Sequence, residues 1–349
     1  MTKETVLKVS FSESIPDLLT KLNCTIVVST YTVNKIIFIC PNGHSDIIQF
    51  PKYFKKPMGI AVSGDKLAVA SLNKVTVFGS SPKLALNYPM KPKTYDTLFM
   101  PRAEYYTGKV DVHDLNWGDA GLWGVTTAFS CLSIIDDNHS FTPEWQPSFI
   151  SSLMPEDRCH LNGMAMKEGQ PRYVTALSQT DTKNGWRKNI ENSGVLMDVN
   201  TGKILLDHLP VPHSPRYIDG SIYFLLSGTG DLVRYDIETK TQESVELPGF
   251  ARGMAEYGDY LFIGLSQIRK SSKSFHKLPV KNKAKHAGVV VLYRPTMSII
   301  GELQYDNVIE EIYDVQILPN LIRPGMVNTE NDIHESSLSS PGLHFWRKT

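Results

Sequence analysis

Short runs of apolar and β-branched residues alternate with clusters of Gly, Pro, Asn and Asp along most of the chain. Runs of about four to eight residues between such turn signals are typical of β-strands. Helical periodicity is confined to one modest candidate at 15–22 (IPDLLTKL). The pattern therefore predicts an all-β protein. The clearest expected strands are 24–30, 35–40, 46–50, 66–71, 74–78, 221–228 and 260–266.

One arrangement of residues recurs along the chain: a small or polar lead, a short apolar run, a tight turn with Gly, and a second strand that ends in Ser or Gly. Its central apolar positions are 37 to 61 residues apart. These spacings bracket the roughly 40–50 residues of one four-stranded propeller blade. We predict a single β-propeller of six blades, with seven as the alternative because the longest spacings leave room for further strands. The central positions are Ile60, Leu115, Met164, Tyr217, Met254 and Val315.

The two ends of the chain complement each other. The last repeat, at 312–318, supplies an inner strand with little strand-like sequence after it, whereas the strands of 24–50 lack an inner strand. Joining the two makes one shared blade and removes the open edges of the ring. The expected organisation is an N-terminal extension at 1–23, a propeller at 24–327 and a C-terminal tail at 328–349. Phe345 and Trp346 are candidates to dock that tail.

Composition narrows the partners and the compartment. Among 349 residues, Lys plus Arg and Asp plus Glu both number 36, so the chain has no general attraction for nucleic acid or anionic membranes. The N-terminus does not resemble a signal peptide, and no apolar stretch reaches the roughly 18 residues of a transmembrane helix. We therefore expect a cytoplasmic protein that contacts neither nucleic acid nor membrane; its oligomeric state is left open. The four cysteines form no CxxC pair, which favours buried thiols over disulfides or zinc.

The propeller geometry turns the repeat into a site prediction, because the innermost strands of all blades line one channel. His113, His160 and His213 lie just before the apolar run of their units, 47 and 53 residues apart. Imidazoles from adjacent blades can hold one divalent metal ion of unspecified identity. They can equally act without metal, as hydrogen-bonding groups or as a catalytic acid and base. Both interpretations stay open at this stage.

Charged residues recur near the same positions. Arg216 and Arg252 occupy approximately equivalent places and favour carboxylate, phosphate or sulfate ligands, because guanidinium groups bind planar anions in a fork. The alternative is that they pair with acidic residues and hold blades together. Glu310 and Glu311 open the last inner strand and are candidates for proton transfer or for such structural ion pairs.

Further substrate contacts are expected from four residues near these motifs. We expect the basic segment 269–286 to be an exposed loop, or alternatively a lid over the channel mouth or a contact for an anionic group. Nucleotide hydrolysis and serine-hydrolase chemistry find no support, since the chain lacks a P-loop, a GxGxxG after a strand, an HExxH and a GxSxG. The four expected contact residues are Asp114, Asn162, Trp186 and Arg187.

An ordered series of motifs resembles a bacterial family of conserved propeller-like proteins of unknown function. The similarity runs from about Ser29 to Pro324. It implies a propeller-like fold and a functional face at the motif positions, and it implies no particular reaction. The motifs are DVHD (111–114), RCHLNG (158–163), PHSPR (212–216), LPGFARG (247–253) and EEIYDVQ (310–316).

These observations favour an enzyme that binds a small polar or anionic molecule in the central channel. Lyase, isomerase, cyclase or hydrolase chemistry, with or without a metal, all require a polarised substrate and proton transfer. The alternative is a propeller that binds a ligand or another protein without catalysis, since the fold does not decide the function.

Overall fold

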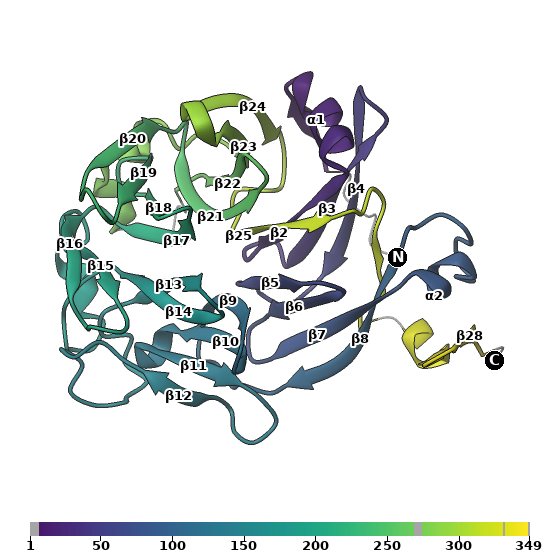
Figure 1. Ribbon diagram of the computed structural model, residues 1–349, viewed down its shortest axis with the longest axis horizontal. Helices are drawn as coiled ribbons and strands as arrows, with labels where there is room; N and C mark the ends of the chain where they lie inside the picture. Colours follow the sequence, from purple (N-terminus) through teal and green to yellow (C-terminus); the bar gives the residue numbers. More distant parts are fainter. Residues whose placement is uncertain (1–6, 269–273, 331, 348–349) are drawn as a thin grey trace.

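The computed structural model describes residues 7–268, 274–330 and 332–347. Six small sheets stand in a ring around one axis (Figure 1), each joined to its neighbours through its innermost strand. The predicted six-bladed propeller is therefore confirmed, and the seven-bladed alternative is wrong. Within the described residues, no helix has the length and apolar character needed to cross a membrane.

The innermost strands carry the six central apolar positions of the sequence repeat, all of them in the predicted strands. These strands are short, and they contact each other around the axis in the order of the blades. They are β25 (Asp314–Pro319), β5 (Ile60–Ser63), β9 (Val112–Gly118), β13 (Leu161–Lys167), β17 (Pro212–Ile218) and β21 (Phe250–Tyr257).

The middle strands of each blade are almost wholly buried, because both faces of every sheet pack against a neighbouring blade. Their apolar runs therefore look continuous in the sequence. The second strands are β2 (Cys24–Thr30), β6 (Lys66–Ala70), β10 (Gly121–Thr126), β14 (Gln170–Ala176), β18 (Ser221–Leu226) and β22 (Tyr260–Ser266). The third strands are β3 (Lys35–Asn42), β7 (Val75–Ser81), β11 (Cys131–Ile135), β15 (Gly194–Asp198), β19 (Asp231–Asp236) and β23 (Ala287–Tyr293).

The outermost strands are more exposed and more polar than the middle ones. Two of them are extended by extra strands that cover their free edges, as soluble sheets require. The outermost strands are β4 (Asp46–Tyr53), β8 (Leu98–Tyr105), β12 (Thr142–Trp145), β16 (Ile204–Leu209), β20 (Gln242–Glu246) and β24 (Ser298–Tyr305). The additions are β1 (Val9–Phe11), antiparallel to β24, and β26 (Gly325–Met326), parallel to β8.

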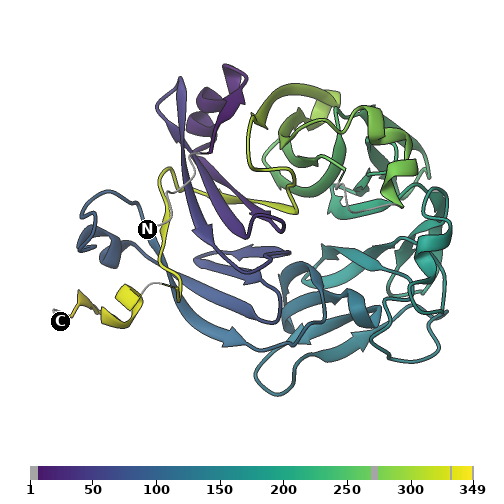
Figure 2. The same ribbon diagram turned by 180° about the vertical axis from the view of Figure 1, so that it is seen from behind.

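The ends of the chain close the ring as predicted. Strand β2 pairs with β25 over six residue pairs, from Cys24 opposite Pro319 to Ser29 opposite Asp314. Figure 2 shows β2 (purple) and β25 (yellow) side by side from the back of the molecule. The expected helix is confirmed as α1 (Ser14–Leu22). It buries Ile15 in the core between the shared blade and the blade of β21–β24.

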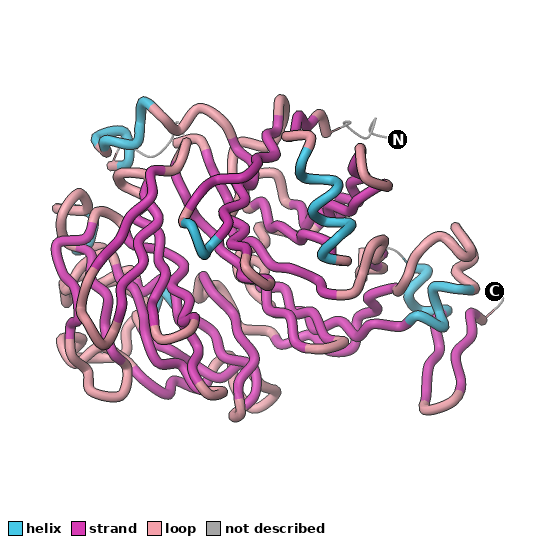
Figure 3. Tube along the Cα trace, turned by 45° about the horizontal axis from the view of Figure 1, so that its top comes forward, coloured by secondary structure: helices cyan, strands magenta, loops and turns pink. Residues whose placement is uncertain are grey.

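The C-terminal segment projects from the body next to β8 as a small hairpin of β27 (Ser337–Ser340) and β28 (Leu343–Trp346) (Figure 3). Its anchor is Trp346, which contacts the loop after α2 (Pro82–Leu86). The Trp346 ring lies 5.2 Å from the Tyr88 ring, and its indole nitrogen donates to the Leu84 carbonyl at 2.9 Å. The short 3-10 turn η6 (Asp332–Ser336) precedes the hairpin.

Neighbouring blades are joined in three similar pairs. In each pair a side chain of one inner strand accepts a hydrogen bond from a backbone amide of the next inner strand. The ring therefore has an approximate threefold repeat of blade pairs. The three bonds run from Ile60 to Asp314 Oδ2 at 2.8 Å, from Met164 to Asp114 Oδ2 at 3.0 Å and from Gly253 to Ser214 Oγ at 3.0 Å.

Between these pairs, glycines allow the inner strands to touch. A side chain at any of these glycines would collide with the neighbouring backbone or with a proline ring, so the ring closes only with hydrogen at these positions. An added Cβ would lie 2.9 Å from Asp114 Cα at Gly59, 2.5 Å from Pro215 Cδ at Gly163 and 2.6 Å from Asp314 Cα at Gly253.

We expect Gly163→Ala to destabilise the propeller by about 1–3 kcal/mol, the usual effect of overpacking a close contact. The matched control is Gly249→Ala, because its added Cβ would meet only Leu265 side-chain atoms at 3.7–3.9 Å. Thermal unfolding followed by circular dichroism measures both. Equal melting temperatures for the two variants would show that the inner strands are not held this tightly.

Candidate functional site

A cavity of about 350 Å³ opens where the inner strands begin. Every blade contributes to its wall, either through its inner strand or through a loop next to it. The lining residues are Tyr31, Met58, Asp111, His113, Asp157, His160, Trp186, Arg187, His213, Phe250, Arg252, Phe275 and Tyr313.

Irregular pairing of the inner strands directs side chains toward this mouth. Strands β13, β17 and β21 each show a register shift close to their start, and β10 shows one opposite the start of β9. Such bulges re-aim side chains and are frequent beside functional sites. The two arginines lie at different places relative to these shifts. Arg252 lies within the irregular stretch of β21 and lines the cavity, whereas Arg216 is paired with Tyr223 of β18 and turns into the ring.

Two histidines occupy equivalent positions on alternate blades. His113 and His213 each donate from Nδ1 to the carbonyl oxygen two residues earlier, of Asp111 at 3.1 Å and of Val211 at 3.2 Å. Both of those earlier residues have left-handed backbone, with φ of 54° and 57°. This uncommon conformation turns each carbonyl toward the imidazole. Tyr313 is the third member of the set, one hundred residues after His213, and it also lines the cavity.

His160 is placed differently. With φ of 53° it takes the place of Asp111 and Val211, so that Asn162 occupies the position that is histidine in the other two blades. Its Nδ1 lies 2.9 Å and 3.0 Å from the two carboxylate oxygens of Asp157. Its ring is 4.8 Å from the His113 ring, centroid to centroid. The sequence repeat therefore brings His160 to the same mouth through a different local geometry.

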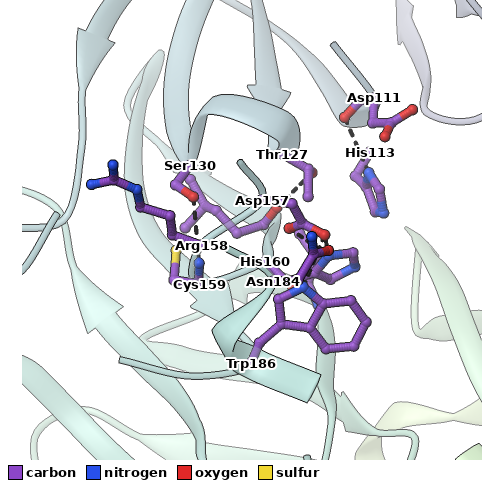
Figure 4. Close-up of polar contacts among 12 residues, drawn as sticks. Asp111, His113, Thr127, Ser130, Asp157, Arg158, Cys159, His160, Asn184 and Trp186 are labelled. Atoms are coloured by element: carbon purple, nitrogen blue, oxygen red, sulfur yellow. Dashed lines mark hydrogen bonds and ion pairs between the residues drawn. The ribbon is translucent and has the colours of Figure 1, made fainter. Parts of the chain in front are cut away.

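Asp157 links His160 to Trp186. The indole nitrogen of Trp186 donates to Asp157 Oδ2 at 2.9 Å, while the two aromatic rings lie 4.3 Å apart (Figure 4). One carboxylate thus orients both rings. Arg158 fixes the surroundings, since it reaches Asp181 at 2.7 Å and so ties the segment of Asp157 to the loop that carries Trp186.

Burial lowers the pKa of two of the three imidazoles. Removal from water holds the pKa of His213 well below its usual value, and the nearby Arg252 guanidinium lowers it further. Burial likewise lowers the pKa of His113, with added repulsion from His160 and Arg252. The pKa of Asp111 is raised, first by its removal from water and then by the neighbouring Asp157 carboxylate. Two neutral imidazoles therefore face the one that has a carboxylate partner.

Two arginines supply positive charge. The Arg252 guanidinium stacks on the Tyr313 ring at 3.5 Å and lies 4.0 Å from Glu311. Arg187, more exposed, lies over the Trp186 ring at 4.1 Å. Both positions suit a fork-shaped contact with an anionic group at the mouth.

Two long loops form one wall of the cavity. The loop between β14 and β15 carries Trp186 in the 3-10 turn η2 (Gly185–Lys188), and the loop between β22 and β23 carries Phe275 in η3 (Phe275–Lys277). They meet in one apolar cluster that also contains Val280 of η4 (Pro279–Asn282). Of the segment 269–286, predicted as an exposed loop or alternatively a lid, Phe275 lines the cavity, while 269–273 lie outside the described residues.

Six of the predicted site residues line the cavity: His113, His160, His213, Trp186, Arg187 and Arg252. The other five have contacts elsewhere in the ring. Asn162 joins the Pro212 carbonyl to the Thr175 hydroxyl. Glu311 is buried below Arg252, and Glu310 is exposed, with its carbonyl accepting from the Gln267 amide.

Asp114 and Arg216 form an ion pair among the inner strands at 3.2 Å. Arg216 also donates to the carbonyl oxygens of Met254, Met164 and Pro215. Its guanidinium therefore binds the backbone of two neighbouring blades and its own strand. This is the blade-joining role that the sequence left as the alternative for the arginines.

The repeat overlooked several lining residues. Asp157 could have been recognised from the sequence, because carboxylates commonly orient histidine rings and this one lies three residues before His160. Tyr313 was also recognisable, by its equal spacing from the two histidines. The aromatic side chains of Tyr31, Phe250 and Phe275, and that of Met58, had no signal that separated them from core residues.

The predicted metal ion has no preformed site among the described residues. Across 7–268, 274–330 and 332–347, no three His, Cys, Asp or Glu side chains are grouped so that they could hold an ion. The imidazoles do have one property of metal ligands, since each Nδ1 is engaged by an oxygen and Nε2 is the remaining nitrogen.

Solved structures that resemble this chain share its fold at very low sequence identity. A chain from the crystal structure of a nidogen/laminin complex has 10% identity and a TM-score of 0.52, covering 85% of this chain and 99% of its own. A protein of unknown function from Bacteroides caccae has 10% identity and a TM-score of 0.52, covering 84% and 98%. Curated proteins provide no sequence match.

The sequence itself matches one family model, described as a domain of unknown function (DUF4915), over residues 13–327. The matched part contains all six blades, α1 and every lining residue of the cavity. This chain therefore belongs to the DUF4915 family.

Proposed function

We propose that the protein is an enzyme that transfers protons on a small anionic substrate in the cavity at the channel mouth. His160 is the acid–base group, and Asp157 is its positioning residue. His113 and His213 are neutral hydrogen-bonding groups, and Arg252 with Arg187 binds the anionic part of the substrate.

The contact between Asp157 and His160 carries this proposal. A carboxylate at 2.9 Å from Nδ1 holds the proton on that nitrogen and leaves Nε2 with its lone pair. It also stabilises the imidazolium that forms when Nε2 takes a proton from the substrate. The same arrangement orients the histidine base in hydrolases of unrelated fold.

The other two imidazoles support different roles because their partners differ. Both rings donate to a carbonyl oxygen, which stabilises an imidazolium less than a carboxylate does. Burial further disfavours the charged form of these two rings. Environments that separate similar groups in this way distinguish the proton-transfer group from its neutral neighbours. Lyases, isomerases, cyclases and hydrolases all use this kind of proton transfer.

We expect His160→Gln to lower turnover by about 10²–10⁴-fold, the usual contribution of a general acid or base. Asp157→Asn lowers it as well, because the amide cannot stabilise an imidazolium. The assay incubates the full chain in D₂O with small hydroxy, keto and sugar acids and their lactones. Proton NMR then reports exchange, elimination, isomerisation or hydrolysis.

The control for this assay is His208→Gln, an exposed histidine outside the cavity. If the wild-type chain binds members of the panel but leaves all of them unchanged, the protein is a binding module, and acid–base catalysis is ruled out. If His160→Gln keeps full turnover, His160 is not the acid–base group.

A second expectation concerns pH. Because the folded-state pKa of His213 lies below its ordinary value of 6.5, the unfolded chain takes up this proton first as the pH falls. His213 therefore opposes folding below about pH 6.5. Imidazole ¹⁵N spectra at pH 6 should show His213 neutral with the proton on Nδ1. A charged His213 under these conditions contradicts the assigned role.

Binding of one divalent metal ion by His113, His160 and His213 is the second candidate. The engaged Nδ1 atoms favour it, although the rings must move together to hold an ion. Elemental analysis of protein purified without added metal tests this candidate: a stoichiometric ion that is lost in His160→Gln supports it. Less than about a tenth of an equivalent, with activity that survives a chelator, excludes it.

A further inference from the structure

The free edges of His113 and His213 define a hydrogen-bonding pattern for the ligand. For both residues, all hydrogen bonds within the described part of the chain are made by Nδ1. His213 is 4% exposed, yet its Nε2 is not one of the fully buried polar atoms that lack a hydrogen-bond partner, so this atom is accessible. Because His213 lines the cavity, its Nε2 is open to that cavity.

Both rings are locked as acceptors at this edge. The partner of His113 Nδ1 is a carbonyl oxygen, which can only accept. The same holds for His213, whose second partner, the Ser227 hydroxyl at 2.8 Å, uses its own proton to donate to the Ala251 carbonyl. Nδ1 must carry the proton in each neutral ring, so Nε2 can only accept.

An acceptor-only group calls for a donor on the ligand. Hydroxyl and N–H groups qualify, whereas a second carboxylate would face the lone pair directly. A ligand without donors would leave two desolvated acceptors unpaired, which weakens binding. The ligand must therefore present at least two donors.

Arg252 adds the third requirement. It lies on the blade next to His213, and its charge reaches both imidazoles strongly enough to lower the pKa of each. That charge disfavours an ammonium group at the same edges, so the donors are neutral groups such as hydroxyls. At 4.0 Å the Glu311 contact is an ion pair without a hydrogen bond, which leaves room for a ligand carboxylate on the guanidinium.

The cavity size and walls limit the rest of the molecule. A volume of about 350 Å³ is near the lower end for ligand pockets, so one small molecule fills it. Tyr31, Trp186, Phe250 and Phe275 supply flat apolar faces around the polar floor. Such faces pack against the C–H groups of a compact ring or chain.

We propose that the ligand is a small polyhydroxy carboxylate of the sugar-acid class, with its carboxylate on Arg252 and two hydroxyls donating to Nε2 of His113 and His213. This deepens the proposed function, because it names the substrate class of the same cavity. His160 would then face the carbon or hydroxyl that exchanges a proton.

The test separates the two halves of the ligand. Calorimetric titration of the full chain compares four probes, gluconate, galactonate, glucuronate and galacturonate, with hexanoate, which lacks hydroxyls, and sorbitol, which lacks the carboxylate. Two neutral hydrogen bonds correspond to roughly tenfold or more in affinity. At least one sugar acid should therefore bind at least about tenfold tighter than hexanoate and than sorbitol.

Variants should split this preference. His213→Phe removes an acceptor and keeps an aromatic ring beside Phe250, so it should weaken the sugar acid about fivefold and spare hexanoate. His113→Phe, at a less buried position, repeats the test if His213→Phe does not fold. Arg252→Gln should weaken both acids by about tenfold or more and spare sorbitol. His208→Phe and Arg102→Gln, both outside the cavity, are the controls.

Three results overturn the proposal: no sugar acid binds tighter than hexanoate, 2-aminohexanoate binds as tightly as the best sugar acid, or the His113 and His213 variants weaken hexanoate equally. Failure here and failure of the proposed function are distinguishable. If another acid is turned over in a His160-dependent way, only the substrate class is wrong. If a sugar acid binds with the expected pattern but His160→Gln changes no turnover, only the catalytic role is wrong.

Discussion

Close contact between neighbouring inner strands is the constraint on which the rest of the molecule depends. Glycines at Gly59, Gly163 and Gly253 leave no space for a side chain, and side-chain acceptors on the intervening strands bind the backbone amides of the next blade. Since these contacts fix the distance between strands, they also fix the distance between the groups at the channel mouth. A looser ring would carry the same residues without a defined cavity.

The approximate threefold repeat of blade pairs explains why the site is chemically mixed. His113, His213 and Tyr313 hold one position on alternate strands, and Arg252 with Met58 and Asn162 holds the position between them. The odd member, His160, lies two residues before the position of Asn162, just ahead of β13, and has a carboxylate partner in place of a carbonyl. This single departure from the repeat yields the one imidazole of the cavity that contacts a carboxylate.

Much of this could be predicted from the sequence, because repeated spacing reports which residues share a ring position. Six blades, the shared blade and the meeting of His113, His160 and His213 near one mouth followed from that spacing. The register shifts in the inner strands could not be predicted; Arg252 lies within one of them, whereas Arg216 lies in the regular pairing after one. Phe275 and the packing of its loop on the loop of Trp186 were also beyond reach, since long connections do not follow the repeat.

The blade shared by both ends of the chain also has a consequence for synthesis. Tyr313 and the strand that closes the ring are among the last parts of the propeller to leave the ribosome, long after β2 has been made. Pairing between such distant segments is slow, because a long stretch of chain must first become ordered. The binding pocket is therefore completed only when nearly the whole polypeptide exists, because a chain that ends before β25 lacks both the closing strand and Tyr313.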